Sequence, residues 1–238
     1  MSITAIILTY NEEKNLPNCL ESIKELADEI IIVDSGSTDK TAGIAESFGA
    51  KVLQHEFKNQ AETFNWALDN IEIKGDWIFR LDADEYLTPE LAKEIKNTIK
   101  GNPSTSSGNI SPERGEGEAK DYLGNITGYY MKRRVYFMGR WMRHGGYYPY
   151  WFLRLWRNGK GRYEKREVDE HLKITEGEVG KLKHDFVDDN KNGLRRWIKK
   201  HKNYAEREVQ EIIKSKGAIG LMNKKRRIYR CLPPFLRA

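Results

Sequence analysis

The chain has little cysteine and no long apolar run. Its only cysteines are Cys19 and Cys231, which lie far apart and lack the close spacing of metal-binding pairs. We therefore predict free thiols in a reducing compartment. The apolar runs "AIIL" and "IIIV" are far shorter than the roughly 20 residues that cross a bilayer. The N-terminus also lacks the basic lead and small-residue cleavage site of a signal peptide, so secretion is not predicted.

Charge is distributed unevenly along the chain. The formal net charge is +6, but residues 191–238 hold 15 Lys and Arg against 3 Asp and Glu, whereas residues 1–190 hold 26 against 32. A basic tail on an acidic body predicts an anionic partner, either nucleic acid or membrane. From Asn192 onward, apolar residues recur at helical spacing beside a basic face, which favours a helix lying on anionic lipid.

Strands and helices are predicted to alternate through the first hundred residues. Apolar runs at 3–10, 29–36, 50–55 and 77–81 are typical of buried strands, and helical patterns follow at 12–27, 37–49, 59–70 and 88–100. Ser37 or Thr38 is the expected N-cap of the second helix, and Gly49 its end. Such alternation across short connections predicts a parallel sheet with right-handed crossovers, the α/β class. Residues 101–120, rich in Gly, Ser and charge, are predicted to form a mobile loop.

Polar clusters close three of the predicted strands. They are "TYNEE" at 9–13, "DSGSTD" at 34–39 and "DADE" at 82–85. Ligands of parallel sheets bind beyond the carboxyl ends of the strands, so these clusters predict a binding site. Three acids in four positions repel one another. The acidic cluster alone leaves two readings open, a solvated loop and a site for a divalent cation with oxygen ligands.

The second half interleaves aromatic residues with arginine. Residues 129–164 read "YYMKRRVYFMGRWMRHGGYYPYWFLRLWRNGKGRYE". Exposed aromatic faces beside arginine stack on nucleobases and also suit sugar rings, while an aromatic core would account for about half of these side chains. A further strand, "EVDEHLKI", is predicted to begin at the acid pair Asp169 and Glu170.

Three motifs carry a resemblance to a known family. The segments "AIILTYNEEKNLPNCLESI", "IIIVDSGSTDKT" and "WIFRLDADE" resemble the nucleotide-sugar half of family 2 glycosyltransferases, which have the GT-A fold. The later aromatic segment with "VDEHL" resembles the branch of bacterial lipopolysaccharide-core β-glucosyltransferases and surface-polysaccharide enzymes. The resemblance implies a Rossmann-like, mostly parallel sheet flanked by helices over residues 1–190. It divides into a nucleotide-sugar half (1–100), the loop (101–120) and an acceptor half (121–190). Residues 191–238 would then be a basic helical tail, either naturally short or truncated.

The resemblance also implies roles for individual residues. Asp34 would accept the uracil N3–H through a charge-assisted bond, Asp82 would lie near the ribose, and Asp84 would bind Mn²⁺ or Mg²⁺ bridging the diphosphate of a UDP-sugar. The implied nucleotide-sugar site comprises Thr9, Tyr10, Asn11, Glu12, Asp34, Gly36, Asn65, Asp82 and Ala83.

In the second half, the resemblance implies a catalytic base and acceptor contacts. Glu170 matches the family's acid, but Val168-Asp169-Glu170 stands where relatives commonly have Val-His-Glu, so Asp169 is the alternative base. The implied acceptor or sugar contacts are Trp141, Arg143, His144 and Arg154. The predicted membrane contacts in the tail are Lys224, Lys225, Arg226 and Arg227.

Together these features predict an inverting, metal-dependent hexosyltransferase peripheral to the cytoplasmic face of the membrane. Its acceptor would be a lipid-linked saccharide or lipopolysaccharide core. One alternative, a nucleotidyltransferase, usually needs a Gly-rich basic phosphate loop near its first strand, and "TYNEEKN" is not one. Another is a nucleic-acid-binding module, which predicts salt-sensitive binding through residues 191–238. We do not predict a nucleic-acid partner.

Overall fold

The computed structural model describes residues 1–101, 126–164 and 171–199, together with 202, 205, 206 and 209. The chain divides into two compact units, Met1–Arg166 with Glu170–Asn192, and Glu167–Asp169 with Gly193–Ala238. The described part of the second unit includes a helix at 193–199 with exposed Leu194, Trp197 and Ile198. The predicted loop at 101–120 lies, apart from residue 101, outside the described residues.

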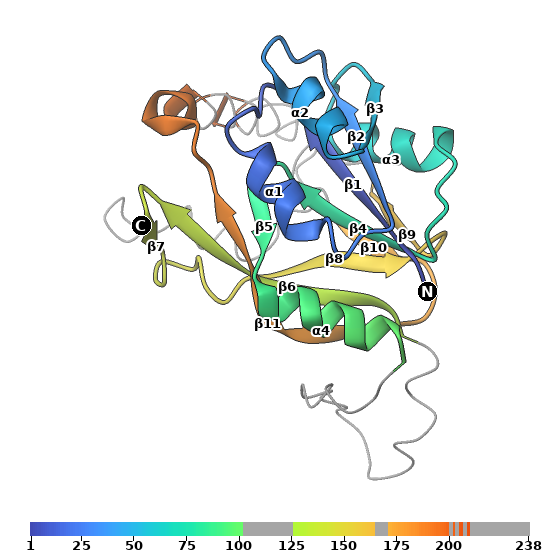
Figure 1. Cartoon of the computed structure of the whole chain (residues 1–238). Coiled ribbons are helices and arrows are strands. Elements are labelled where there is room, and N and C mark those ends of the chain that lie inside the picture. The colour runs from blue at the N-terminus through green and yellow to red at the C-terminus, as the bar shows by residue number, and fades with distance from the viewer. Residues whose placement is uncertain (102–125, 165–170, 200–201, 203–204, 207–208, 210–238) are drawn as a thin grey trace. The chain divides into compact units, whose positions relative to one another are not determined.

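The first half of the first unit contains four parallel strands, as predicted. These are β1 (Ile3–Thr9), β2 (Glu29–Asp34), β3 (Lys51–Gln54) and β4 (Trp77–Asp82), in the order β3-β2-β1-β4 (Figure 1). The middle strands β1 and β4 are buried along almost their whole length, because helices cover both faces of a parallel sheet. This arrangement confirms the predicted α/β class.

Four helices connect and follow these strands: α1 (Leu16–Ile23), α2 (Thr41–Ser47), α3 (Gln60–Asn70) and α4 (Pro89–Ile99). The side chain of Thr88 accepts a hydrogen bond from the backbone N–H of Leu91 and caps α4, at the first residue of the helical pattern 88–100. The cap prediction for the second helix was wrong, because α2 begins only at Thr41. The Ser37 hydroxyl instead donates to the Asp34 carboxylate.

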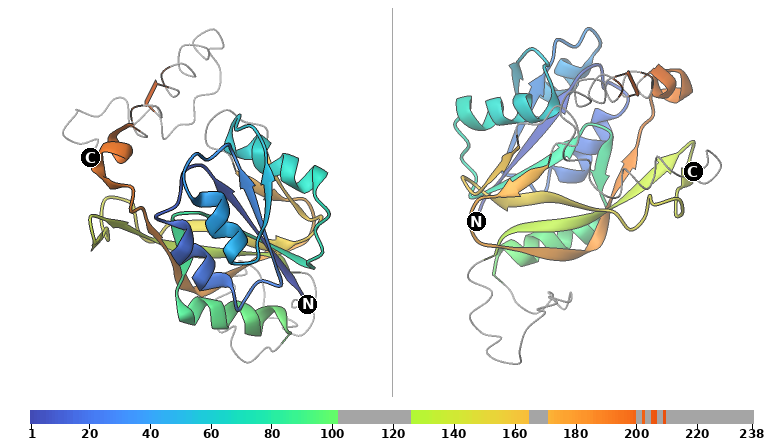
Figure 2. Two further views of the ribbon diagram at one scale, coloured as in Figure 1. Left: turned by 45° about the horizontal axis from the view of Figure 1, so that its top comes forward. Right: turned by 180° about the vertical axis from the view of Figure 1, so that it is seen from behind.

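The second half of the sheet is mixed and curls back toward the first. It comprises β5 (Glu85–Leu87), β6 (Ile126–Phe137), β7 (Arg140–Trp141), β8 (Trp151–Arg157) and β11 (Glu178–Asp189). The order continues β4-β8-β6-β11-β5, with β7 paired to β6. Strand β5 follows β4 after a two-residue turn, yet it pairs with β11 at the far end of the order. The sheet must therefore curl, as Figure 2 shows.

Two hydrophobic clusters fix the sheet against its helices. One joins β1 and β4 to α1, α4 and the β5–β11 pair, while the other lies between the opposite face and α3. In the second cluster Phe64 on α3 packs against Trp156 and Tyr163, the last of these on β9 (Gly161–Tyr163), which pairs with β10 (Leu172–Ile174). Both clusters end at the carboxyl edge of β1, β2 and β4, where the last residues of the strands are the polar Thr9, Asp34 and Asp82.

Candidate active site

The loop after β2 is organised around a buried carboxylate. Asp34 is 0% exposed and accepts hydrogen bonds from the Thr9 hydroxyl (2.8 Å), the Ser37 backbone N–H (2.8 Å) and the Ser37 hydroxyl (2.5 Å). Burial alone would raise the pKa of Asp34, but hydrogen bonds from Ser37, Thr9 and Gln54 outweigh it and lower that pKa below its ordinary value. Gly36, at φ +79°, provides the left-handed conformation in this turn.

The loop after β1 joins this network through Asn11. Its backbone N–H donates to the Ser37 hydroxyl (2.8 Å), and its side-chain oxygen accepts from the backbone N–H groups of Thr38 (2.7 Å) and Asp39 (3.3 Å). Asn11 has φ +54°, a conformation that asparagine tolerates better than most residues. The two loops therefore form one hydrogen-bonded layer, beside which the Tyr10 ring is exposed.

The acidic cluster forms the turn between β4 and β5. Asp82 ends β4, and its Oδ1 accepts hydrogen bonds from Arg80 (2.8 Å) and Gln60 (3.1 Å) while its Oδ2 accepts from Arg154 (3.2 Å). Its backbone N–H donates to the Glu85 carboxylate (2.9 Å). Two guanidinium groups thus face a carboxylate that the sequence shows only as part of an acidic run.

A buried ion pair lies beneath this turn. Arg154 and Glu85 are each 2% exposed, and the guanidinium donates to the carboxylate at 2.5 Å. Burial favours the neutral carboxyl and raises the pKa of Glu85, whereas Arg154 acts in the opposite direction and favours the carboxylate. Burial would lower the pKa of Arg154, but Glu85 and Asp82 raise it overall. We predicted Arg154 as an acceptor or sugar contact. In the structure its side chain is buried and donates hydrogen bonds to Asp82 and Glu85.

Asp84 occupies the turn itself and is partly exposed. Its Oδ2 accepts a hydrogen bond from the Asn190 amide (2.7 Å), and its carbonyl oxygen accepts from the Asp189 backbone N–H (3.0 Å). In the described part of the chain, no three His, Cys, Asp or Glu side chains gather as a metal site. A single accessible carboxylate nevertheless fits Mg²⁺ or Mn²⁺, because such ions commonly take one or two carboxylates and complete their shell with substrate phosphates and water.

Residues 190–192 connect the acidic turn to the loop after β1. The Asn15 side-chain oxygen accepts from the Lys191 backbone N–H (2.8 Å). The Glu12 carboxylate accepts from the amides of Asn15 (2.5 Å) and Asn192 (3.0 Å). The structure therefore brings Thr9, Asn11, Glu12, Asp34 and Asp84 to one edge of the sheet. No sequence pattern predicted the contribution of residues 190–192 to this site.

Other predicted site residues lie elsewhere or have other partners. The Asn65 amide is buried and exchanges two hydrogen bonds with the Tyr163 backbone (3.0 and 3.1 Å), so it joins α3 to β9 in place of the expected nucleotide contact. Trp141 lies on β7, and exposed Arg143 stacks on its ring with 4.3 Å between guanidinium carbon and ring centroid. His144 is exposed in the same loop. The predictions for Asp169, Glu170, Lys224, Lys225, Arg226 and Arg227 lie outside the described residues.

The curled α/β sheet with polar loops at the carboxyl edge is that of GT-A glycosyltransferases. Among solved structures, residues 1–349 of S. aureus TarS match with a TM-score of 0.50 and 17% identity, over 79% of this chain and 60% of that one. The family model for glycosyl transferase family 2 matches residues 4–174. The chain belongs to glycosyltransferase family 2.

Curated relatives agree with this assignment. A lipopolysaccharide core biosynthesis glycosyltransferase, LpsC of Rhizobium meliloti, is 31% identical over 191 residues, covering 76% of this chain and 60% of LpsC. An uncharacterised glycosyltransferase of Rickettsia bellii is 45% identical over 100 residues, or 40% of this chain and 31% of that protein. The chain thus matches only part of each relative's length. None of the described helices has the length and apolar character needed to cross a membrane.

Proposed function

We propose that this family 2 glycosyltransferase transfers a hexose from a UDP-sugar with the help of Mn²⁺ or Mg²⁺. One observation carries the proposal: the partly exposed Asp84 lies at the same sheet edge as the hydrogen-bonded loops of Asn11 and Asp34. A nucleoside diphosphate needs both features, polar backbone and side-chain groups for the nucleoside and a cation site for the phosphates. The S. aureus TarS fragment with this fold has been solved with UDP, and we extend that donor to this chain.

Different residues of the chain would bind the nucleobase, the ribose and the diphosphate of the donor. Thr9, Tyr10 and Asn11 would line the nucleobase end, where the uracil N3–H could replace the Ser37 hydroxyl as a donor to Asp34. Asp84 would hold the cation, which when bound would offset the negative charge of the departing diphosphate. Asp82, held by Arg80 and Arg154, would orient the turn and lie near the ribose.

The acceptor proposal depends on sequence and on the LpsC relative. LpsC is described as a lipopolysaccharide core biosynthesis enzyme, so we propose a lipopolysaccharide-core or lipid-linked saccharide as acceptor. Inversion needs a carboxylate opposite the diphosphate to take the acceptor proton. Glu170 is our proposed base, with Asp169 as the alternative. The basic residues of 224–227 would hold the enzyme on the cytoplasmic face of the membrane.

A donor panel tests the proposed reaction. Purified full-length chain is incubated with UDP-glucose, UDP-galactose, UDP-N-acetylglucosamine and GDP-mannose, with Mn²⁺ or with EDTA, and nucleoside diphosphate release is measured with and without truncated lipopolysaccharide. We expect release from one or more UDP-sugars, dependent on Mn²⁺ and stimulated by acceptor, and a product of inverted anomeric configuration by NMR. Preference for the GDP-sugar, full activity in EDTA, or retention of configuration would overturn the proposal.

A further inference from the structure

The β6–β7 hairpin rises from the edge that carries the acidic turn. Tyr136 on β6 pairs with Asp189 on β11, and the next residue along, Asn190, donates to Asp84. Beyond Tyr136 the hairpin closes through the pair Phe137 and Arg140. Figures 1 and 2 show this hairpin projecting beyond the rest of the sheet. Its tip is therefore a protruding feature next to the proposed donor site.

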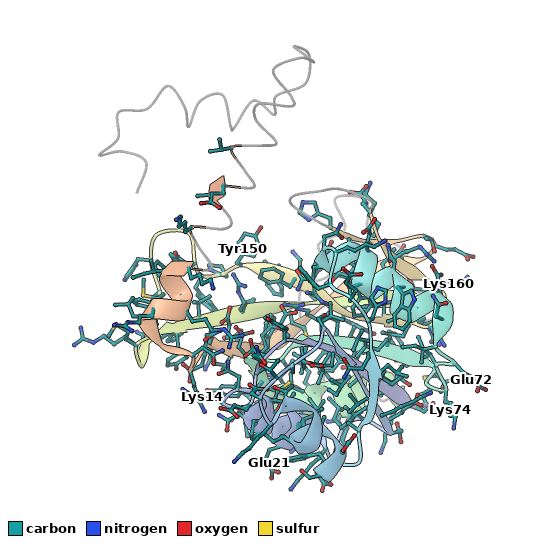
Figure 3. The ribbon with its side chains drawn as sticks, turned by 90° about the horizontal axis from the view of Figure 1, so that it is seen from above. Lys14, Glu21, Glu72, Lys74, Tyr150 and Lys160 are labelled. Carbon is teal, nitrogen blue, oxygen red and sulfur yellow. The ribbon has the colours of Figure 1, made fainter. Side chains whose placement is uncertain are left out.

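The hairpin tip and the adjoining loop expose apolar and aromatic side chains. Met138, at the tip, is 76% exposed and has φ +49°, while Gly139 follows at φ +76°. Tyr147 and Tyr150, in the loop that leads from β7 to β8, are 45% and 49% exposed, and Figure 3 labels Tyr150 at this surface. Single exposed apolar residues are common on proteins, but here one on the hairpin is followed by two on the adjoining loop, which makes the hairpin and loop together a candidate contact surface.

Positive charge surrounds these side chains. Arg140 and Arg143 are exposed, and neither forms an ion pair with a carboxylate of the described residues. Arg134 (2.6 Å) and Lys132 (3.2 Å) both pair with one buried carboxylate, that of Asp185. Because Arg133 also pairs with Asp188, the positive charge available to a partner on this surface is that of Arg140 and Arg143. The surface therefore suits a negatively charged partner that also accepts apolar side chains.

We propose that the β6–β7 hairpin and the loop at 142–150 form a docking surface for an anionic lipid bilayer. Met138 would enter the headgroup region, Tyr147 and Tyr150 would lie at the interface, and Arg140 and Arg143 would contact lipid phosphates. A protruding apolar tip favours a bilayer over a soluble glycan, because a glycan offers it no hydrocarbon to enter. The proposal rests on the proposed function in one respect: docking would hold the Asp84 turn next to a lipid-carried acceptor. This surface would be a second membrane contact, besides the one proposed for the basic tail.

Vesicle flotation of the full chain tests the surface directly. Vesicles of phosphatidylethanolamine with phosphatidylglycerol are compared with pure phosphatidylcholine, in the native chain and in a background with residues 224–227 neutralised. Met138→Ser should lower binding to the anionic vesicles severalfold, whereas Met138→Leu should retain it. Arg140→Gln should lower binding about fivefold, the effect of one charge near the surface. Lys74→Gln, which removes a charge ahead of β4, should have no such effect (Figure 3).

The depth of the tip gives a second measurement. Met138→Cys in a Cys231→Ser background is labelled with an environment-sensitive fluorophore, the other cysteine, Cys19, being buried. We expect a blue shift with anionic vesicles. No shift, or flotation of Met138→Ser and Arg140→Gln equal to that of Lys74→Gln, would overturn the docking surface. If Met138→Ser and Arg140→Gln lose binding to a delipidated core oligosaccharide while their flotation is unchanged, the docking surface is also overturned, and the surface is assigned to glycan binding.

Nucleotide-sugar hydrolysis separates the two proposals. Soluble donor hydrolysis should be the same in Met138→Ser and the native chain, because Met138 is 76% exposed and is not among the residues placed at the donor site. If the native chain hydrolyses no nucleotide sugar yet flotation depends on Met138, the proposed function fails and the docking surface stands.

Discussion

Replacing Arg154 with methionine tests whether the buried pair holds the acidic turn. Arg154 is 2% exposed, and its guanidinium carbon lies 5.2 Å from the ring centroid of Phe152 and 5.3 Å from that of Phe186, so an unbranched apolar side chain suits the space. The substitution removes the hydrogen bonds to Glu85 and Asp82. Removing one partner of a buried ion pair typically costs 3–5 kcal/mol. Because the Glu85 carboxyl can bind a proton once its partner is gone, we expect the lower end, about 3 kcal/mol.

The assay is reversible urea unfolding followed by tryptophan fluorescence, with thermal unfolding beside it. A loss of about 3 kcal/mol corresponds to a Tm lowered by roughly 6–12 °C in a chain of this size. Arg162→Met is the matched control, since Arg162 forms an exposed ion pair with Asp69 and should cost less than about 1 kcal/mol. Glu85→Gln together with Arg154→Met should cost less than the two single changes added. Equal losses in Arg154→Met and Arg162→Met would show that the buried pair does not hold the acidic turn.

Three further predictions concern the donor loop, the base and the tail. Hydrogen bonds lower the pKa of Asp34, so its ionised form stabilises the fold above about pH 3.9. In urea unfolding, the native chain should have a higher free energy of unfolding than Asp34→Asn, and this difference should disappear as pH falls through the lowered pKa of Asp34. A difference that does not depend on pH would contradict this. Glu170→Gln should lower turnover about 10²-fold or more with UDP-sugar affinity unchanged, and a larger loss in Asp169→Asn would move the base to Asp169. Neutralising 224–227 should weaken anionic-vesicle binding by about 1 kcal/mol per charge, and binding that persists at high salt would assign that anchor to apolar insertion.

Local patterns predicted much of the first half of the fold. The runs that became β1, β2 and β4 are apolar on both faces, and the Thr88 cap lies within its own helix, so no distant partner was needed to recognise them. The acidic turn was predicted for the same reason. By contrast, β11 carries Lys, His and Asp among its apolar residues, and it is held by pairing with β6 and β5, far away in sequence. No local pattern indicates such pairing.

The buried polar residues show the same limit at the site. Arg80 and Arg154 stand inside apolar strands, a signal that a charged side chain is buried, yet their partners become visible only when β4, β5 and β8 are brought together. Asn65 was predicted to contact nucleotide, but it pairs with the Tyr163 backbone across 98 residues of sequence. Sequence therefore indicated which residue types the edge holds, and tertiary pairing decided which of them remain accessible.

Calorimetry of UDP binding tests whether Asp84 holds the cation that binds the donor's diphosphate. The native chain, Asp84→Ala and Glu72→Gln are titrated with UDP in Mn²⁺ and in EDTA, with circular dichroism to confirm the fold. Glu72 is the control because it is an exposed acid that lies before β4, whereas Asp84 follows that strand. If Asp84 binds the cation, the native chain and Glu72→Gln will bind UDP more tightly in Mn²⁺, and Asp84→Ala will lose this gain while remaining folded. Unchanged UDP affinity of folded Asp84→Ala in Mn²⁺ would contradict it.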